Sequence, residues 1–156
     1  MRVGLDSMAR KVTNHTKRLT AAARKGLRAS QAIRLMGFSL ETIGTGRAVL
    51  RMDARSRHKQ LHGVVHGGIL AALADTAGAM AAQTVLRKGA ALATIELKIN
   101  YLEPVPGGRI RAEARVLRAG RNFVVAECEI FDAKGKLAAK ALLTFGAAGG
   151  HSFESM

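Results

Sequence analysis

A long apolar segment over residues 66–82 constrains the fold more than any other part of this chain. Its apolar side chains recur at intervals of three and four residues, and no proline interrupts them. This spacing predicts one continuous helix. Only Asp75 and Thr76 are polar between Ile69 and Ala82, which is typical of a helix that is surrounded by other structure.

Asp75 is the residue of this helix that needs an explanation. Alanine and glycine dominate the sequence around it, so a neighbouring backbone can approach the helix closely. Burying a carboxylate at such a place costs free energy unless the group is paired or used in chemistry. We therefore take Asp75 as a candidate functional residue.

The segments on either side of the helix have the composition of strands. They are rich in β-branched and apolar residues and are separated by glycine-containing or polar turns. The predicted strands cover residues 38–43 and 47–52 before the helix, then 93–101, 110–117, 123–131 and 137–145 after it.

The run 93–101 shows the clearest strand pattern. Apolar residues occupy alternate positions from Ala93 through Ile95 to Tyr101, whereas Thr94 and Glu96 fall on the other face. Because short turns join the last four strands, we predict an antiparallel meander. The fold class is α+β, with an antiparallel sheet of about six strands wrapped around one long central helix.

The chain of 156 residues suits one folded core with extensions at both ends. We divide it into a basic leader over 1–34, a main domain over 35–146 and a flexible tail over 147–156. No apolar run is long enough to cross a membrane, and no secretory signal precedes the domain, so we expect a soluble protein. The single cysteine, Cys128, fits a core position and a reducing compartment, and we place the protein in the cytoplasm.

The leader carries most of the basic excess. The formal net charge is +14, and residues 1–34 hold nine Lys or Arg against Asp6 alone, which is +8 and leaves +6 elsewhere. Residues 7–28 predict a basic amphipathic helix, followed by a short helix that ends at Gly37. We favour a solvated helix resting on the domain. A membrane contact, a nucleic-acid contact or a transit peptide would also explain the charge.

The helix start carries a second candidate feature. His66, Gly67 and Gly68 place free backbone N–H groups at the positive end of the helix dipole, and the glycines leave room for a ligand. Such a place can stabilise an oxyanion. Two glycines alone could merely permit a tight turn, but the carboxylate of Asp75 on the same helix favours a chemical role.

Three groups of residues carry a family resemblance. They are the triplet at 66–68 followed by Asp75, the strand 94–104, and the turn 118–121. With these features the chain resembles the hotdog-fold acyl-CoA thioesterases of the phenylacetyl-CoA thioesterase (PaaI-type) branch, over about residues 35–146. The resemblance implies the hotdog fold and hydrolysis of acyl-CoA without a metal or other cofactor.

The resemblance also implies roles for particular residues. Asp75 corresponds to the catalytic carboxylate, acting as nucleophile or general base, and Gly67 to the backbone donor that polarises the thioester carbonyl. Gln60 and Thr94 correspond to residues that orient the reacting groups, and His66 to one that holds the loop. The expected substrate contacts, including basic side chains for the phosphates of coenzyme A, are Gly68, Lys98, Arg118 and Arg121.

Helix geometry predicts the oligomeric state. Gly67 and Asp75 are eight residues apart, which is about 12 Å along a helix axis, so they cannot both contact one carbonyl. We therefore expect a homodimer with two composite sites, and the resemblance implies further pairing into a tetramer. A non-catalytic acyl-CoA-binding regulator is the alternative, although it has little use for Asp75. A hotdog dehydratase is disfavoured because such enzymes pair a histidine with a carboxylate.

Overall fold

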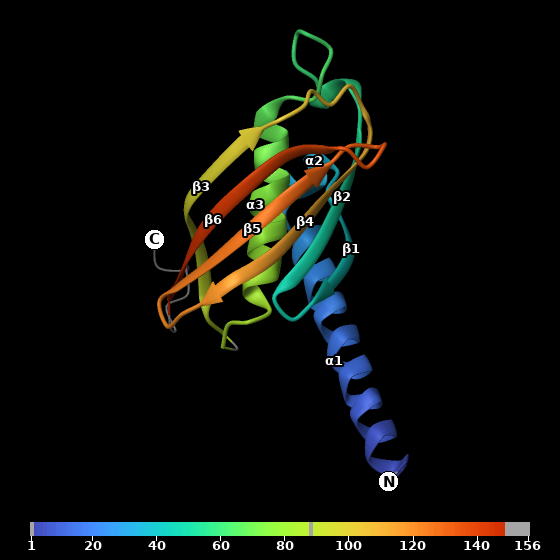
Figure 1. The fold of residues 1–156 in the computed structure, drawn as a ribbon, viewed down its shortest axis with the longest axis vertical. Helices are drawn as coiled ribbons and strands as arrows, with labels where there is room; N and C mark the ends of the chain where they lie inside the picture. Colours follow the sequence, from blue (N-terminus) through green and yellow to red (C-terminus); the bar gives the residue numbers. More distant parts are fainter. Residues whose placement is uncertain (1, 88, 149–156) are drawn as a thin grey trace.

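The computed structural model describes residues 2–87 and 89–148, which form one long helix, a wrapped sheet and a central helix (Figure 1). The elements in chain order are α1 (Arg2–Ala29), α2 (Gln31–Met36), β1 (Ser39–Gly44), β2 (Arg47–Ala54), a 3-10 turn (Ser56–His58), α3 (Gly67–Gln83), β3 (Ala91–Tyr101), β4 (Gly108–Ala119), β5 (Phe123–Phe131) and β6 (Leu137–Ala148).

The sheet is antiparallel, has the strand order β1-β2-β4-β5-β6-β3, and curls around α3. The predicted α+β architecture is therefore confirmed. The buried side of α3 is made of small and medium apolar residues that face the sheet, such as Leu73, Ala77 and Ala81. At Gly78 a β-carbon would lie 3.0 Å from the ring of Phe145, so this glycine allows the sheet to approach.

The predicted meander is wrong at its first connection. β3 pairs with β6, while β4 pairs with β2, so β3 lies at the sheet edge far from its successor in sequence. The segment between them is fixed to other elements, because Leu102 N–H donates to Ala138 O and Val105 O accepts from Val65 N–H, both at 2.8 Å. Pro104 beside Val105 has no backbone N–H to donate to a ladder.

A β-bulge in β3 changes which side chains face α3. The register with β6 shifts between Thr94 and Glu96, so the predicted alternation fails in the first half of the strand. Ile95, expected on the inner face, is 59% exposed, and Thr94 instead hydrogen-bonds to α3. Because of the bulge, Thr94 and Tyr101 both contact α3 although seven positions separate them.

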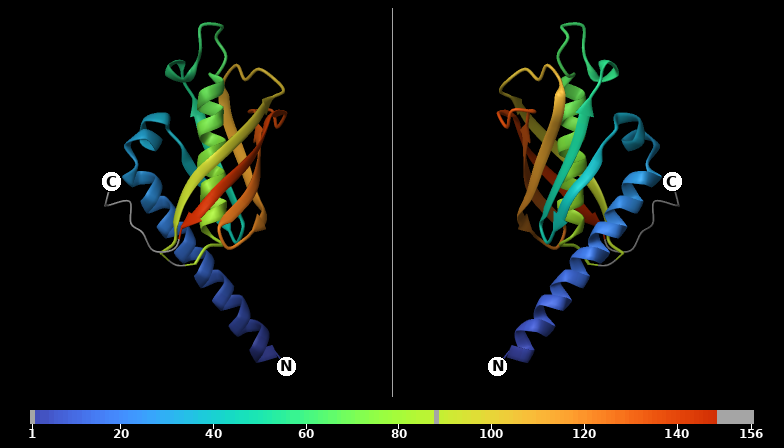
Figure 2. Two further views of the ribbon diagram at one scale, coloured as in Figure 1. Left: turned by 90° about the vertical axis from the view of Figure 1, so that its left-hand side faces the viewer. Right: turned by 90° about the vertical axis from the view of Figure 1, so that its right-hand side faces the viewer.

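The leader helix lies against the open side of the wrapped sheet. α1 packs Leu19, Ala23 and Leu27 onto the core, and its N-terminal half projects beyond the rest of the molecule (Figure 2). α2 ends at Gly37, which has φ 72°, as predicted from the left-handed preference of glycine. Among the described residues, no helix has the length and apolar character needed to cross a membrane.

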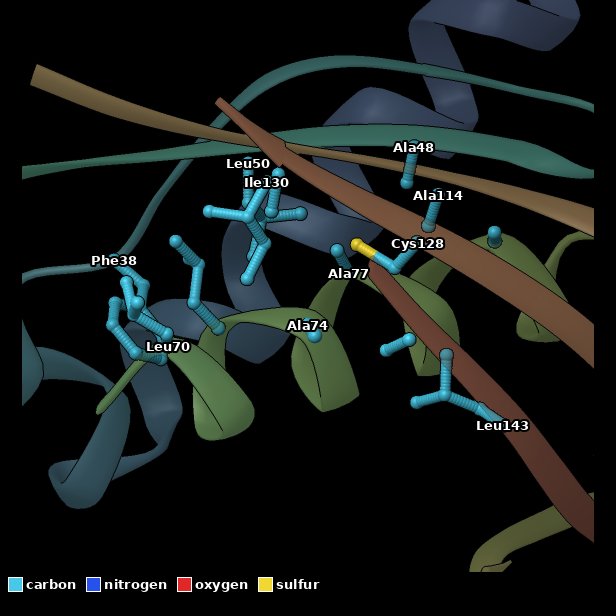
Figure 3. Packing of buried hydrophobic residues seen from close by; sticks show 14 of the residues in the cluster. Phe38, Ala48, Leu50, Leu70, Ala74, Ala77, Ala114, Cys128, Ile130 and Leu143 are labelled. Atoms are coloured by element: carbon cyan, nitrogen blue, oxygen red, sulfur yellow. The ribbon is translucent and has the colours of Figure 1, made fainter. Parts of the chain in front are cut away.

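Cys128 belongs to the core, as the sequence predicted. It is fully buried on β5 and points toward α3 near Ala77 (Figure 3). Burial, followed by the nearby carboxylates of Glu129, Glu113 and Glu127, raises the pKa of this thiol to about 12. A thiol with so high a pKa does not supply a thiolate nucleophile at neutral pH.

Candidate active site

Hydrogen bonds at the start of α3 occupy most of its first backbone N–H groups. His66 caps the helix, because its Nδ1 accepts the Gly68 N–H at 2.9 Å. The N–H groups of Ile69 and Leu70 donate to the His66 carbonyl oxygen at 2.9 and 3.4 Å. Within the described part of the chain, the Gly67 N–H thus keeps no protein acceptor, whereas the Gly68 N–H, which we expected to be free, is occupied.

Tyr101 restrains the carbonyl group of Gly67. Its hydroxyl donates to Gly67 O at 2.8 Å, and a β-carbon on Gly67 would lie 3.0 Å from the ring. The peptide group between Gly67 and Gly68 is therefore held at its carbonyl by Tyr101 and at its N–H by His66. These protein contacts favour glycine at both positions, since a β-carbon on Gly68 would lie 3.0 Å from the His66 ring.

Sequence reasoning did not single out Tyr101. A signal was present, because it is the only tyrosine of the chain and ends the strand that follows the helix. Its face on that strand depends on the bulge, however, so the pattern alone could not connect it to Gly67.

Gln60 lies beside this helix end, as predicted. It lines a pocket of about 350 Å³ together with Gly67, Leu70 and Tyr101. The loop that carries Gln60 is tightly turned, because Gln60 N–H donates to Val64 O at 2.9 Å. The pocket therefore brings the predicted amide and the free N–H to one place.

His58 is buried and hydrogen-bonds to both ends of the loop that precedes α3. It is only 3% exposed, its Nδ1 accepts the Arg55 N–H at 3.1 Å, and its carbonyl oxygen accepts the His66 N–H at 2.8 Å. Burial, and then the positive charges of Arg57 and Arg55, lower the pKa of His58. A neutral imidazole is what accepting the Arg55 N–H requires.

Asp75 lies halfway along α3 on the face that the sheet does not cover. The carboxylate is half-buried, and Thr94 Oγ1 donates to its Oδ1 at 2.8 Å. This hydrogen bond orients the carboxylate and leaves Oδ2 without a partner among the described residues. The structure thus pairs Asp75 with Thr94, in a less buried place than the apolar sequence around Asp75 indicated.

The predicted catalytic residues fall into two groups within one chain. Gln60, His66 and Gly67 meet at the start of α3, whereas Asp75 and Thr94 meet two turns further along. The structure does not bring the two groups together. Among the described residues, no three or more His, Cys, Asp or Glu side chains are grouped so that they could hold a metal ion.

The predicted phosphate-binding residues lie apart from both groups. Lys98 is on β3 and exposed. Arg118 is exposed near the end of β4, and Arg121 is exposed in the turn between β4 and β5. None of these three makes an ion pair within the part of the chain that the structure describes. Their charges are available to a ligand. Within one chain, however, these three residues do not line the pocket beside Gly67, and none is the hydrogen-bond donor to Asp75.

Comparisons with known proteins identify the family of this chain. Residues 62–139 match the model of the family described as the thioesterase superfamily. The chain is 31% identical to the proofreading thioesterase EntH of Klebsiella pneumoniae over 120 residues, 77% of this chain and 88% of the relative. It is 27% identical to the 1,4-dihydroxy-2-naphthoyl-CoA hydrolase of Escherichia coli, over 82% of this chain and 94% of that one.

A solved structure shares the fold. The phenylacetic acid degradation protein PaaI of Thermus thermophilus, in a mutant form, superposes with a TM-score of 0.69 at 30% identity. The superposition covers 75% of this chain and 98% of the PaaI chain.

Proposed function

Since the chain belongs to the thioesterase superfamily and is a thioester hydrolase, we propose that it cleaves acyl-CoA or aryl-acyl-CoA esters with Asp75 and the Gly67 N–H. One observation carries this proposal. The Gly67 N–H, which has no acceptor within residues 2–87 and 89–148, lies at the N-terminus of the helix that also bears a hydroxyl-bonded carboxylate. These are the two elements that acyl transfer needs, a donor for the developing oxyanion and a nucleophile or base.

The chemistry follows from these groups. The Gly67 N–H and the helix dipole stabilise negative charge on the thioester oxygen, and one such donor is worth about 2.7–4 kcal/mol. Asp75 either attacks the carbonyl carbon and expels the CoA thiolate, giving an anhydride that water hydrolyses, or it removes a proton from an attacking water. Both routes give the free acid and CoA. Thr94 orients the carboxylate, and Gln60 positions the substrate or water.

Tyr101 and His66 act as positioning residues in this proposal. Glycine has few conformational restrictions of its own, so the direction of the Gly67 N–H depends on what holds the neighbouring peptide group. The hydroxyl of Tyr101 and the imidazole of His66 restrain that peptide at both ends. The donor is then already oriented when the substrate arrives.

A second copy of the chain would complete the site. Gly67 and Asp75 lie about 12 Å apart along one helix, and β3 has an unpaired edge. If two β3 strands pair antiparallel about a two-fold axis near the middle of the strand, the start of one β3, with Thr94, lies near the end of the other, with Tyr101. This places one copy's Gly67 beside the other's Asp75, in a composite dimer that could pair again into a tetramer.

The remaining site assignments are part of the same proposal. Lys98, Arg118 and Arg121 supply positive charge for the phosphates of coenzyme A, which lie far from the reacting carbonyl. Gly68 contributes close access at the helix start rather than a hydrogen bond. The free thiol of Cys128 suits a cytoplasmic enzyme.

Release of CoA thiol from a panel of acyl- and aryl-CoA esters tests the function. We expect turnover of at least one class by the wild-type chain and its loss in Asp75→Asn, which keeps the shape of the side chain and removes its charge. Hydrolysis by Asp75→Asn at the wild-type rate would contradict the assigned chemistry.

A further inference from the structure

The wrapped sheet leaves one face of α3 open. Its two edge strands, β1 and β3, do not pair with each other, and the leader helix α1 crosses the opening near the C-terminal end of α3 (Figure 2). A groove of about 370 Å³ lies there. Its apolar walls include Leu19, Ala23 and Gly26 of α1, Ile43 of β1, Met80 of α3 and Leu92 of β3.

This groove adjoins the catalytic carboxylate. Ala79, which lines it, follows Asp75 by four residues and therefore lies one turn, about 5.4 Å, further along the same face of α3. Leu92 precedes Thr94 by two residues and shares its face of β3. Both walls thus run from the Asp75–Thr94 hydrogen bond toward the turn that joins α3 to β3.

The lining selects for an apolar occupant. No charged side chain lines the groove among the described residues, and its polar members, Gln83 and Thr84, lie where α3 ends. A phosphate or carboxylate would lose its hydration there without gaining a partner, whereas a hydrocarbon chain or an aryl ring would gain by leaving water. The volume also lies within the range of small-molecule sites.

We propose that the groove between α1 and α3 binds the acyl or aryl group of the thioester, and that α1 sets the length it accepts. This inference rests on the proposed function, because it places the reacting carbonyl at Asp75. The family match covers residues 62–139, so the limiting wall comes from a helix outside the matched region. The leader thus acquires a role in substrate selection that its charge does not indicate.

Gly26 offers the sharpest way to change the groove. A β-carbon added there meets no other atom within 4 Å, so a larger side chain has room to enter the groove without displacing the helix. Ala21 is exposed. It points away from Gly26, because five residues correspond to a net rotation of about 140° around a helix. Gly26→Leu and Ala21→Leu therefore place the same side chain inside and outside the groove.

The test measures kcat/KM for straight acyl-CoA esters of increasing length in the wild type and both variants. Each buried methylene is worth about 0.8 kcal/mol, so wild-type kcat/KM should rise roughly fourfold per methylene until the groove is filled. In Gly26→Leu this rise should end at a shorter acyl chain, and kcat/KM for the longest esters should be lower than in wild type by tenfold or more. Ala21→Leu should follow the wild-type curve.

A direct binding measurement separates this inference from the proposed function. The probe is a non-hydrolysable decanoyl-CoA thioether, compared with its propionyl counterpart, titrated calorimetrically into the wild type and Gly26→Leu. Wild type should prefer the longer probe, and Gly26→Leu should lose that preference. An equal preference in both proteins would overturn the acyl groove whether or not hydrolysis is found, whereas absent hydrolysis with a lost preference would refute only the catalytic proposal.

Discussion

The two functional parts of α3 are held in different ways. At its start, His66, Tyr101 and the loop around His58 fix the backbone through hydrogen bonds of 2.8 to 2.9 Å that all come from the same chain. Halfway along, Asp75 is half-buried and accepts a hydrogen bond from Thr94, its one side-chain partner in the described part of the chain. The proposed oxyanion donor is thus organised within one chain, whereas the half-buried carboxylate has the exposure that the proposed substrate and second copy require.

The same strand fastens both parts. β3 contributes Thr94 near its start and Tyr101 at its end, and the bulge between them turns both hydroxyls toward α3. In a regular strand, residues separated by seven positions face opposite sides. One extra residue in an edge strand therefore allows Thr94 to bond the Asp75 carboxylate and Tyr101 to bond the Gly67 carbonyl oxygen.

Removing the carboxylate should have the largest effect. We expect Asp75→Asn to lower kcat/KM roughly 10²- to 10⁴-fold, because a positioned base or nucleophile contributes about that much. The free energy of unfolding should hardly change, since Asp75 is half-buried and Asn can still accept from Thr94. Thiol release and urea unfolding of the same preparations check both statements, and a large loss of stability would show a structural role for Asp75.

Mixing variants should reveal whether the two parts work across a dimer. Gln60→Ala damages the donor end and Asp75→Ala the carboxylate end, and each should be severely impaired alone. After an equal mixture is unfolded and refolded, half of the dimers are mixed, and each should contain one intact and one doubly damaged site. Activity should then recover to about a quarter of wild type. No recovery in confirmed mixed dimers would mean that one chain builds the whole site.

Loosening the donor end should cost less than removing the carboxylate. Tyr101→Phe keeps the ring against Gly67 and removes only the hydroxyl. A net hydrogen bond is worth about 0.5–1.5 kcal/mol, so we expect kcat to fall roughly three- to tenfold with KM nearly unchanged. As a control, Ser39→Ala removes another hydroxyl that donates to a backbone carbonyl, Arg51 O, at the opposite sheet edge. It should change stability but not kcat.

Tyr101 also offers an optical signal for this test. The chain has one tyrosine and no tryptophan, so its intrinsic fluorescence reports this ring alone. Binding of a non-hydrolysable acyl-CoA thioether should change that fluorescence if the Gly67 end contacts the substrate. A signal that stays constant at saturation would place the substrate elsewhere.

Sequence patterns were sufficient for the parts of the fold that follow a regular period. The helix around Asp75, the stop at Gly37 and the core position of Cys128 were all predicted, because each depends on local spacing or on a residue with a strong preference. The family resemblance implied that Thr94 orients one of the reacting groups, and in the structure its hydroxyl donates to Asp75.

The errors arose where long-range contacts override the local pattern. The turn after β3 contains glycine and proline and predicts a hairpin, but hydrogen bonds to Ala138 and Val65 carry it across the start of α3. The bulge at Ile95 leaves no mark in the alternation of apolar residues. The occupied Gly68 N–H and the contact of Tyr101 with Gly67 likewise depend on elements that only the folded chain brings together.

The last and smallest expected effect distinguishes the two parts of α3 by their response to acid. The pKa of His58 is lower in the folded chain than its ordinary value of 6.5, mainly because the ring is buried. The unfolded chain therefore takes up the proton first, and stability is complete above about pH 6.5 and declines as the pH falls toward the folded pKa. Urea midpoints should show this decline in wild type and a smaller one in His58→Asn, whose amide oxygen can still accept the Arg55 N–H.

Hydrogen exchange should show where in the chain this loss occurs. Because the His58 carbonyl accepts the His66 N–H, amide protection should weaken around residues 55–68 before it weakens around Asp75. Equal loss of protection in both regions would mean that His58 does not act at the donor end alone.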